Sequence, residues 1–390
     1  MDLDTFAWLL TEPGQELLGR ARDSSDDPLR AQSALRRDAE PANVAAALTQ
    51  VELRRKAEVK FGELAALMYF TPDGLEQATR LPVAAHRAAR VLASGAGTVI
   101  DLGCGIGGDL VSFARAGLTA AGVDQDPLRV AIAEANLAAL GLGGAVKVAD
   151  ATTVDTSPFE VAFADPARRS ARGRTFDVHD WEPPWSFVEG LLDRDSCVKV
   201  APGIPHSVVP DDVEAEWVSD HREVKEAVLW SGRLATVRRR ATVLGDGGLA
   251  TLTDEDDPVD DGDSPPVGPV ASYLYEPDGA VIRAGLVTAV AGGVQGHLLD
   301  EHIAYVTSEA SFRTPFARGY RVVEQVPFRE KQLKAALRER GIGRLTIKKR
   351  GVSVVPDELR HRLSLSGDDE ATLVLTRAAG HGVGLLVEPF

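Results

Sequence analysis

A glycine-rich segment a quarter of the way along the chain has the residue types that bind a nucleotide. It runs Val99-Ile100-Asp101-Leu102-Gly103-Cys104-Gly105-Ile106-Gly107-Gly108-Asp109. A β-branched strand must turn sharply into a helix there, and glycines allow both the turn and a close approach of ligand to backbone. The spacing Gly103-x-Gly105-x-x-Gly108 also satisfies the dinucleotide fingerprint, so the glycines alone do not identify the ligand. The candidate ligand contacts in this loop are Gly103, Cys104, Gly105, Gly107 and Asp109.

Three aspartates at the ends of consecutive predicted strands narrow the choice of nucleotide. Asp101 precedes the first glycine, where a carboxylate disfavours a pyrophosphate but pairs well with the ammonium group of a methionine moiety. Asp124 follows 23 residues later, where a carboxylate can accept both ribose hydroxyls. Asp150 is placed to accept the amino group of adenine. Each aspartate alone is equally well explained as a turn or N-cap residue, but together they predict S-adenosylmethionine, with Gln125 and Ala151 as further contacts.

An Asp-Pro pair follows the fourth predicted strand. In an open α/β sheet, ligands bind beyond the carboxyl ends of the strands, so Asp165 and Pro166 should face the same crevice as Asp101. Here the chain resembles the class I methyltransferases, and the pair resembles the Asp/Asn-Pro-Pro-aromatic motif of enzymes that methylate nitrogens. The resemblance implies that Asp165 and the backbone at Pro166 hold an amine. The motif is incomplete, because Ala167 and Arg168 replace the second proline and the aromatic residue.

Candidate substrate contacts follow the Asp-Pro pair. Arg168 stands where the motif has its aromatic residue, and Trp181 and Trp185 in the run Trp-Glu-Pro-Pro-Trp could stack a base in its place. The alternative is that these tryptophans only pack the loop. No His-Glu-x-x-His, nucleophile elbow or P-loop occurs, and we expect no metal.

The order of predicted elements explains how these residues could meet. Short strands near 98–100, 120–123, 145–149, 159–163 and 197–200 alternate with helices at 107–117, 127–140 and 186–192. Such alternation predicts a Rossmann-like α/β sheet with parallel strands. Two extended stretches, 223–231 and 234–244, follow without an intervening helix, and we expect them to form an antiparallel pair.

Composition divides the chain into four regions. We predict an N-terminal helical region over 1–92, the cofactor-binding core over 93–245, an acidic flexible linker over 246–268 and an α+β domain over 269–390. Between Asp246 and Asp263 there are eight acidic residues and no basic one, a composition that buries no core and predicts disorder.

The layout resembles one bacterial group of methyltransferases. In that group a core similar to RNA cap guanine-N2 methyltransferases precedes a THUMP-like domain, which implies RNA binding by analogy. The resemblance rests on Phe70-Thr71, 74–80, 201–203, 276–285, Ala304-Tyr305 and 343–351.

Charge is distributed unevenly along this acidic chain. The net charge is −15, yet the residues from Phe316 to Arg362 include thirteen basic and five acidic ones. Lys348, Lys349 and Arg350 follow a predicted strand, whose alternation would place Lys348 and Arg350 on one face and Lys349 on the other. They are candidate contacts for RNA phosphates, and the alternative is a solvated surface.

With two cysteines, an acidic N-terminus and no long apolar run, we expect a cytoplasmic location and no membrane contact; the pattern does not determine the oligomeric state.

The residues together predict an S-adenosylmethionine-dependent methyltransferase that releases S-adenosylhomocysteine. The predicted acceptor is a nucleobase amine in RNA, with a guanine amino group favoured. Two alternatives remain: a methyltransferase for a small molecule or protein, and a non-catalytic RNA-binding module that retains the cofactor fold.

Overall fold

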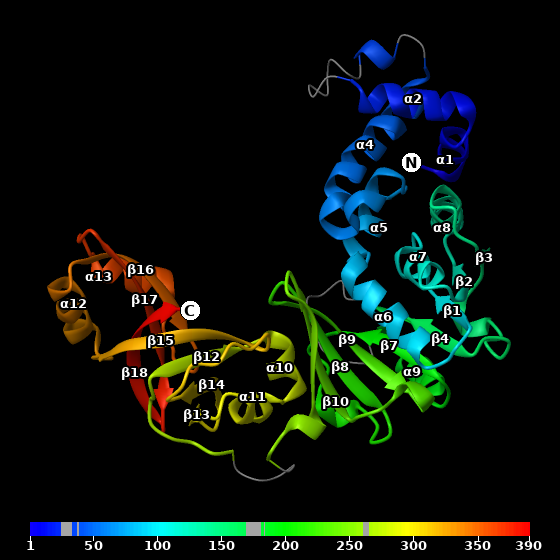
Figure 1. The fold of residues 1–390 in the computed structure, drawn as a ribbon. Helices are drawn as coiled ribbons and strands as arrows, with labels where there is room; N and C mark the ends of the chain where they lie inside the picture. Colours follow the sequence, from blue (N-terminus) through cyan, green and yellow to red (C-terminus); the bar gives the residue numbers. More distant parts are fainter. Residues whose placement is uncertain (25–32, 37–38, 169–180, 183, 260–264) are drawn as a thin grey trace. The chain divides into compact units, whose positions relative to one another are not determined.

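The computed structural model describes residues 1–24, 33–36, 39–168, 181–182, 184–259 and 265–390 (Figure 1). The chain divides into two compact units. The first comprises Met1–Val213 and Val228–Thr236, and the second comprises Glu214–Ala227 and Val237–Phe390.

Five parallel strands form the centre of the first unit. They are β1 (Thr98–Leu102), β2 (Thr119–Asp124), β3 (Ala145–Val148), β4 (Val161–Ala164) and β7 (Ser196–Val200), and they lie in the order β7-β4-β1-β2-β3. Each neighbouring pair is parallel. The predicted Rossmann-like sheet is therefore confirmed. The strand order reverses between β1 and β4, and such a switch point is where open α/β sheets bind their ligands.

Four helices pack against this sheet. They are α6 (Leu81–Ala93), α7 (Gly108–Arg115), α8 (Pro127–Ala139) and α9 (Trp185–Leu192). The side chains of Val99, Phe113, Leu137 and Phe163 are almost fully buried in the shared core. Helix α8 begins where Asp126 accepts a hydrogen bond from the backbone N–H of Leu128 and Pro127 opens the first turn.

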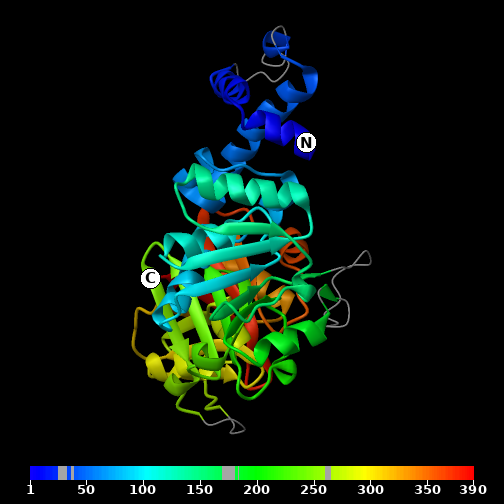
Figure 2. The ribbon, with the colours of Figure 1, turned by 90° about the vertical axis from the view of Figure 1, so that its right-hand side faces the viewer.

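The N-terminal region is helical, as predicted. Figure 1 shows α1 (Leu3–Leu9), α2 (Glu12–Arg22) and α4 (Pro41–Phe61), in blue, followed by the short helix α5 (Pro72–Gln77). Their core includes Phe6, Leu53 and Phe61 and extends to Ile106 and Ile132 of the nucleotide-binding core. The N-terminal helices are thus packed directly onto the glycine-rich loop and α8 (Figure 2).

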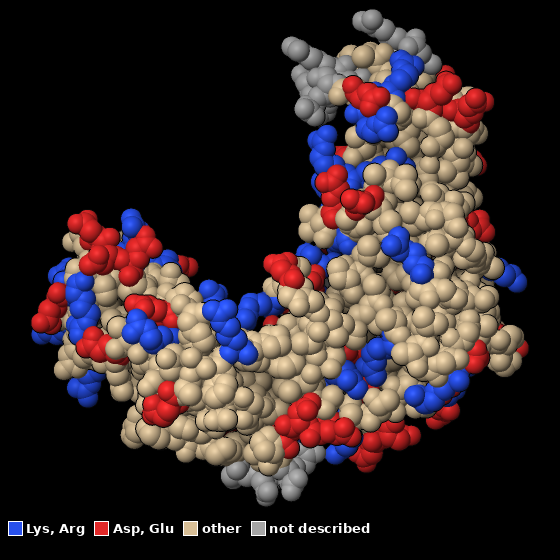
Figure 3. Space-filling model, viewed as in Figure 1, with Lys and Arg blue, Asp and Glu red and all other residues tan. Residues whose placement is uncertain are grey.

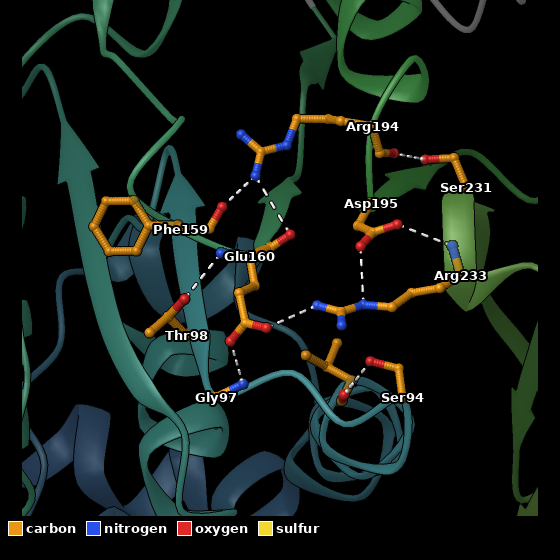
Figure 4. A network of polar contacts seen from close by, with 10 residues as sticks. Ser94, Gly97, Thr98, Phe159, Glu160, Arg194, Asp195, Ser231 and Arg233 are labelled. Atoms are coloured by element: carbon orange, nitrogen blue, oxygen red, sulfur yellow. Dashed lines mark hydrogen bonds and ion pairs between the residues drawn. The ribbon is translucent and has the colours of Figure 1, made fainter.

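A polar network ties together the amino ends of the central strands (Figure 4). The Glu160 carboxylate accepts a hydrogen bond of 2.7 Å from the Gly97 N–H and pairs with Arg233 at 3.0 Å. Arg233 also pairs with Asp195 at 2.8 Å, and Arg194 donates to the carbonyl of Phe159. These contacts join the residues that open β1, β4 and β7. They hold the end of the sheet opposite to the predicted ligand site.

The strands that follow β7 differ from the prediction. Strand β8 (Glu214–Asp220) lies between β9 (Glu223–Ser231) and β10 (Arg239–Gly245), so the predicted antiparallel pairing of 223–231 with 234–244 is wrong. The sequence hides β8 because acidic residues interrupt it. Glu214 and Glu216 are fully buried, which requires partners: Arg240 pairs with Glu214 at 2.7 Å, and the hydroxyl of Thr242 donates to Glu216.

The acidic segment is also more ordered than predicted. Strand β11 (Gly248–Thr253) pairs antiparallel with β10, and a short 3-10 helix at Asp254–Asp256 follows. Thr253 and Asp256 form a capping box there. The prediction of disorder is therefore wrong for residues 248–256, and residues 260–264 lie outside the described part of the chain.

The C-terminal residues form the predicted α+β arrangement. A seven-stranded sheet has the order β13-β14-β12-β15-β18-β17-β16. In chain order its strands are β12 (Tyr273–Pro277), β13 (His297–Asp300), β14 (Ile303–Ser308), β15 (Ala317–Val326), β16 (Ile342–Lys349), β17 (Asp369–Ala378) and β18 (His381–Pro389). The helices are α10 (Gly279–Ala284), α11 (Val287–Gly293), α12 (Glu330–Glu339) and α13 (Pro356–Leu363).

This sheet has two buried faces. Leu333 of α12 and Leu359 of α13 cover one face, and the other face carries a core that includes Leu274, Tyr305 and Tyr320. Strand β16 ends the strand order at one edge and β14 lies near the other edge, yet Arg350, just after β16, lies over the ring of Tyr305. The sheet therefore curls until its edges approach one another. Acidic and basic side chains are interspersed over α12 and α13 (Figure 3).

Candidate functional site

The glycine-rich loop joins β1 to α7 with left-handed backbone conformations. The φ angles of Gly103, Gly105 and Gly107 are +98°, +55° and +83°. A Cβ on Gly103 or Gly105 would have no described atom within 4 Å, whereas one on Gly107 would lie 3.1 Å from the Cβ of Ala133. The first two glycines leave the loop open on the side where a ligand approaches, and Gly107 permits close packing on α8.

Asp124 closes the loop from the end of β2. One carboxylate oxygen accepts a 3.0 Å hydrogen bond from the Gly105 N–H, and the other accepts a 2.9 Å bond from the Asp126 N–H. Each oxygen keeps a second lone pair, which suits it to accept two vicinal hydroxyls as well. Gln125, the next residue, is exposed beside it.

Asp101, at the end of β1, is an unpaired carboxyl group in the interior. Its exposed fraction is 1%, and neither side-chain oxygen has a hydrogen-bond partner among the described residues. Burial raises the pKa of Asp101 well above its usual value, and the neighbouring Asp109 and Asp165 raise it further. An unsatisfied buried carboxyl group costs stability, which a cationic or hydrogen-bond-donating ligand would recover.

Of the remaining predicted cofactor contacts, Asp150 is exposed and the Cys104 side chain is buried. Asp150 is exposed and caps a short 3-10 helix, accepting from the N–H and hydroxyl of Thr152 at 2.9 and 2.7 Å, with Ala151 opening that turn. These hydrogen bonds lower the pKa of Asp150. The Cys104 side chain is buried against β2, because a Cβ on Gly122 would lie 3.0 Å from its sulfur. Burial raises the pKa of the Cys104 thiol, so only the backbone of this residue is suited to ligand contact.

Asp165 begins a chain of polar contacts that the sequence did not reveal. The Lys199 ammonium lies 2.5 Å from Oδ2 of Asp165 and donates to the Thr79 hydroxyl at 3.2 Å. Thr79 in turn donates to Asp109 at 3.0 Å, and Arg87 forms an ion pair with the same carboxylate. The predicted contact Asp109 is therefore engaged inside the protein, and it links the cofactor loop to the N-terminal helices.

Two basic residues of this contact network, Lys199 and Arg87, stand at core positions of their elements and could have been singled out from the sequence. Lys199 is the only charged residue in β7, which is otherwise buried. Arg87 falls on the apolar face of α6 with Val83 and Val91, and its exposed fraction is 1%. Its guanidinium lies 4.7 Å from the centre of the Phe163 ring. A basic residue at a core position of a periodic element indicates a buried partner, because an unpaired buried charge is costly.

Amide and ammonium groups hold the segment that carries Thr79. The side chain of Gln50 pairs with both backbone groups of Phe70, and Asn136 does the same with Tyr69 while also donating to the carbonyl of Ile106. Lys60 donates to three carbonyls near the end of α5, those of Leu75, Glu76 and Ala78, at 2.6 to 2.8 Å. Thr79 therefore stands at the end of a rigidly held turn.

The predicted substrate contacts are described only in part. Pro166 is buried next to Asp165. Arg168 pairs through its backbone with Trp181 in the small antiparallel pair β5 (Ala167–Arg168) and β6 (Trp181–Glu182); the side chains of Arg168 and Trp181 lie outside the described part. Trp185 is half-buried in the first turn of α9.

The predicted basic residues near the end of β16 alternate as expected. Lys348 pairs with Glu276 at 2.7 Å, and Arg350 lies 5.5 Å from the centre of the Tyr305 ring. Lys349 is exposed and follows Leu345 and Ile347 on the face that α12 and α13 cover.

Comparison with known proteins identifies the family. Two relatives, from the CDC 1551 and H37Rv strains of Mycobacterium tuberculosis, are each 39% identical over 337 residues, which cover 83% of this chain and 90% of the relative. Both are named uncharacterised S-adenosylmethionine-dependent methyltransferases. This chain belongs to the S-adenosylmethionine-dependent methyltransferases. The predicted activity class and cofactor are thereby confirmed.

Further matches extend over the rest of this methyltransferase. Residues 317–389 match the family "THUMP domain-like", as predicted, and residues 2–57 match a domain of unknown function, DUF8688. A solved structure from Porphyromonas gingivalis W83, named as a methyltransferase, is 22% identical and superposes with a TM-score of 0.73. The match covers 98% of this chain and 95% of that one, which shows that the fold is shared throughout.

The site fits the cofactor of this family. S-adenosylmethionine supplies an activated methyl group on a sulfonium. The unpaired, buried Asp101 is suited to hold its ammonium group, Asp124 its ribose hydroxyls, and the open faces of Gly103 and Gly105 its backbone contacts. Within the described residues there is no group of three side chains suited to a metal ion, and no helix long and apolar enough to cross a membrane.

Proposed function

We propose that this methyltransferase transfers a methyl group to an amine of a nucleobase in RNA. The observation that carries the proposal is the position of Asp165, which directly follows β4 beside the end of β1, the strand that carries the buried Asp101. A carboxylate there can accept an N–H of the acceptor amine and direct the nitrogen lone pair toward the methyl donor.

The contacts of Asp165 support this role. Lys199 binds Oδ2, whereas Oδ1 has no partner among the described residues. The side chain is about one-third exposed, so a substrate can reach the second oxygen. The ion pair with Lys199 orients the carboxylate before the substrate arrives, which lowers the entropic cost of alignment. Direct displacement at the methyl group requires no covalent intermediate with the protein.

The C-terminal domain supports RNA as the molecule that carries the amine. Its match to a THUMP-like family and its basic stretch from Arg318 to Arg362 both favour an anionic polymer over a small molecule. The two cysteines, Cys104 and Cys197, are free and buried, in keeping with a reducing cytoplasm as the place of action.

Methyl transfer with purified components tests the proposal. The protein is incubated with S-adenosylmethionine labelled in its methyl group and with total cellular RNA. The RNA is then digested completely, and its nucleosides are analysed by mass spectrometry. We expect label in one base-methylated nucleoside with the wild-type protein and none with Asp165→Ala. Cofactor affinity of the variant should stay within a few fold, because the partner of Asp165 is the acceptor. Label that enters only proteins or small molecules would contradict the proposal.

A further inference from the structure

Six polar and aromatic side chains meet where the C-terminal sheet curls. We call them the curl cluster; they are Glu276, Tyr305, Arg318, Tyr320, Lys348 and Arg350. They come from β12, β14, β15, β16 and the residue after β16. The rings of Tyr305 and Tyr320 are 1% exposed, whereas Arg318 is exposed and Lys348 and Arg350 are half-buried. Three cations thus surround two buried phenol rings, with one carboxylate among them.

Direct contacts join four of the six side chains, and the other two, Arg350 and Tyr305, contact each other. Glu276 accepts hydrogen bonds from Lys348 at 2.7 Å and from the Tyr320 hydroxyl at 3.2 Å. The Lys348 ammonium and the Arg318 guanidinium each lie 5.5 Å from the centre of the Tyr320 ring. Arg350 lies 5.5 Å from the Tyr305 ring, and its N–H is bound to the Leu375 carbonyl at 3.1 Å. Cation–π contacts therefore hold the three cationic groups near the two rings.

The charges of the curl cluster do not balance. Four other arginines of this domain have carboxylate partners: Arg321 pairs with Glu388, Arg340 with Glu324, Arg344 with Glu370 and Arg362 with Glu330. Arg318 and Arg350 contact tyrosine rings and have no carboxylate partner among the described residues. Glu276 neutralises only Lys348. The two guanidinium groups lie over Tyr320 and Tyr305, which share one core, and both remain available to an anion.

We propose that the curl cluster binds a phosphate group of the RNA backbone through Arg318 and Arg350. Guanidinium groups match the geometry of phosphate oxygens and bind them in pairs of parallel hydrogen bonds. The inference rests on the proposed function, which makes RNA the substrate, and adds where the strand is held. Lys349 takes no part, since it lies on the opposite face of β16.

The buried rings of Tyr305 and Tyr320 restrict the arginine side chains that lie over them. Burial raises the pKa of Tyr305 and of Tyr320, so both hydroxyl groups stay protonated and neutral. A neutral ring attracts a cation over its face without competing for the anion. Arginines held in this way lose less side-chain freedom when a phosphate binds.

Matched charge-removal variants of the full-length protein test the proposal. Binding of a fluorescein-labelled single-stranded RNA is followed by anisotropy at salt concentrations from about 50 to about 200 mM. Arg318→Gln and Arg350→Gln should each weaken binding about tenfold or more, as expected for one charge-assisted contact. Each should also make the salt dependence shallower by roughly one unit. Lys349→Gln removes the same charge from the opposite face, and its affinity should stay within about twofold of the wild type.

Glu276→Gln should change RNA affinity in the direction opposite to the arginine variants. It removes the one negative charge of the cluster and releases Lys348, so RNA affinity should rise by a few fold. A change that only disturbed the fold would lower affinity. Cofactor binding and the melting temperature, measured on every variant, identify any protein that has failed to fold.

Three results would overturn the inference: wild-type affinity in both arginine variants, an equal loss in Lys349→Gln, or no RNA binding by the wild-type protein. Titration with inorganic phosphate tests whether the site binds free phosphate instead of RNA. If phosphate binds at Arg350 in the micromolar range and RNA does not bind, the site serves free phosphate and the assignment to RNA is wrong. Methylation assays separate the two proposals: unchanged KM for RNA in Arg350→Gln contradicts this inference alone. Arg350-dependent RNA binding without methyl transfer contradicts the proposed function alone.

Discussion

The ammonium nitrogen of Lys199 lies 2.5 Å from Oδ2 of Asp165, and both side chains stand at the carboxyl ends of adjacent parallel strands. This ion pair joins the carboxylate that would face the acceptor to a chain of contacts through Thr79, Asp109 and Arg87. The Asp165 carboxylate is thereby connected to Thr79, which follows α5, and to Arg87 of α6. Activity should accordingly depend on residues that touch neither substrate nor cofactor.

Replacement of Lys199 tests the ion pair. Lys199→Met keeps the length of the side chain but releases Asp165, so kcat should fall about ten- to a hundredfold through loss of alignment. KM for S-adenosylmethionine should change little, because Lys199 contacts the acceptor side. Lys199→Arg should recover part of the rate. Steady-state kinetics with RNA as acceptor measure both constants, and equal rates for the methionine variant and the wild type would exclude a positioning role.

The hydroxyl of Thr79 should matter more than its size. Thr79→Val removes the bridge between Lys199 and Asp109 and should lower kcat several fold, whereas Thr79→Ser keeps the hydroxyl and should retain most activity. Both variants should melt within a few degrees of the wild type. If valine and serine lower the rate equally, the methyl group rather than the hydrogen bonds accounts for the effect.

Asp101 should couple cofactor binding to pH. Its pKa is raised in the folded protein, so the unfolded chain loses the proton first as pH rises above the ordinary value of 3.8. The cofactor-free protein therefore becomes less stable as pH rises toward the folded-state pKa, and Asp101→Asn should remove this part of the loss. Unfolding measured between about pH 5 and about pH 8 tests this, since most other carboxylates are already ionised there. Parallel stability curves for the two proteins would contradict it.

The same variant should lose the cofactor. An ammonium group that pairs with Asp101 displaces its proton, so affinity for S-adenosylmethionine should increase with pH in the wild type. Asp101→Asn should bind weakly and without this pH dependence. Calorimetric titration at several pH values measures both effects, and tight binding by the asparagine variant would remove Asp101 from the cofactor site.

Gly105→Ala separates ligand contact from backbone strain. The φ angle of +55° makes alanine costly by about 1–2 kcal/mol, although no described atom lies within 4 Å of the added methyl group. Gly95, with φ of +83° and the same open surroundings, is a matched control. Both variants should lose stability, but only Gly105→Ala should lose cofactor affinity. Equal cofactor affinity in the two variants would place the ligand elsewhere.

The cofactor half of the site could be predicted from the sequence because its residues are local. A glycine loop and aspartates that end successive strands are brought together by any parallel sheet, so Asp101, Asp124 and Asp165 needed no knowledge of packing. Thr79 and Lys199 could not be placed, because 120 residues separate them and their contact depends on how the N-terminal segment folds onto the core. Strand β8 was missed for a related reason: Glu214 and Glu216 look exposed until Arg240 and Thr242 are seen beside them.

A comparison of RNA nucleosides from cells with and without this protein tests the central claim most directly. Deletion should remove or deplete one base-methylated nucleoside, measured by mass spectrometry after complete digestion of the RNA. Expression of the wild-type protein should restore it, and expression of Asp165→Ala at equal abundance should not. An unchanged set of methylated nucleosides after deletion would contradict the claim that Asp165 and its partners serve methyl transfer to RNA.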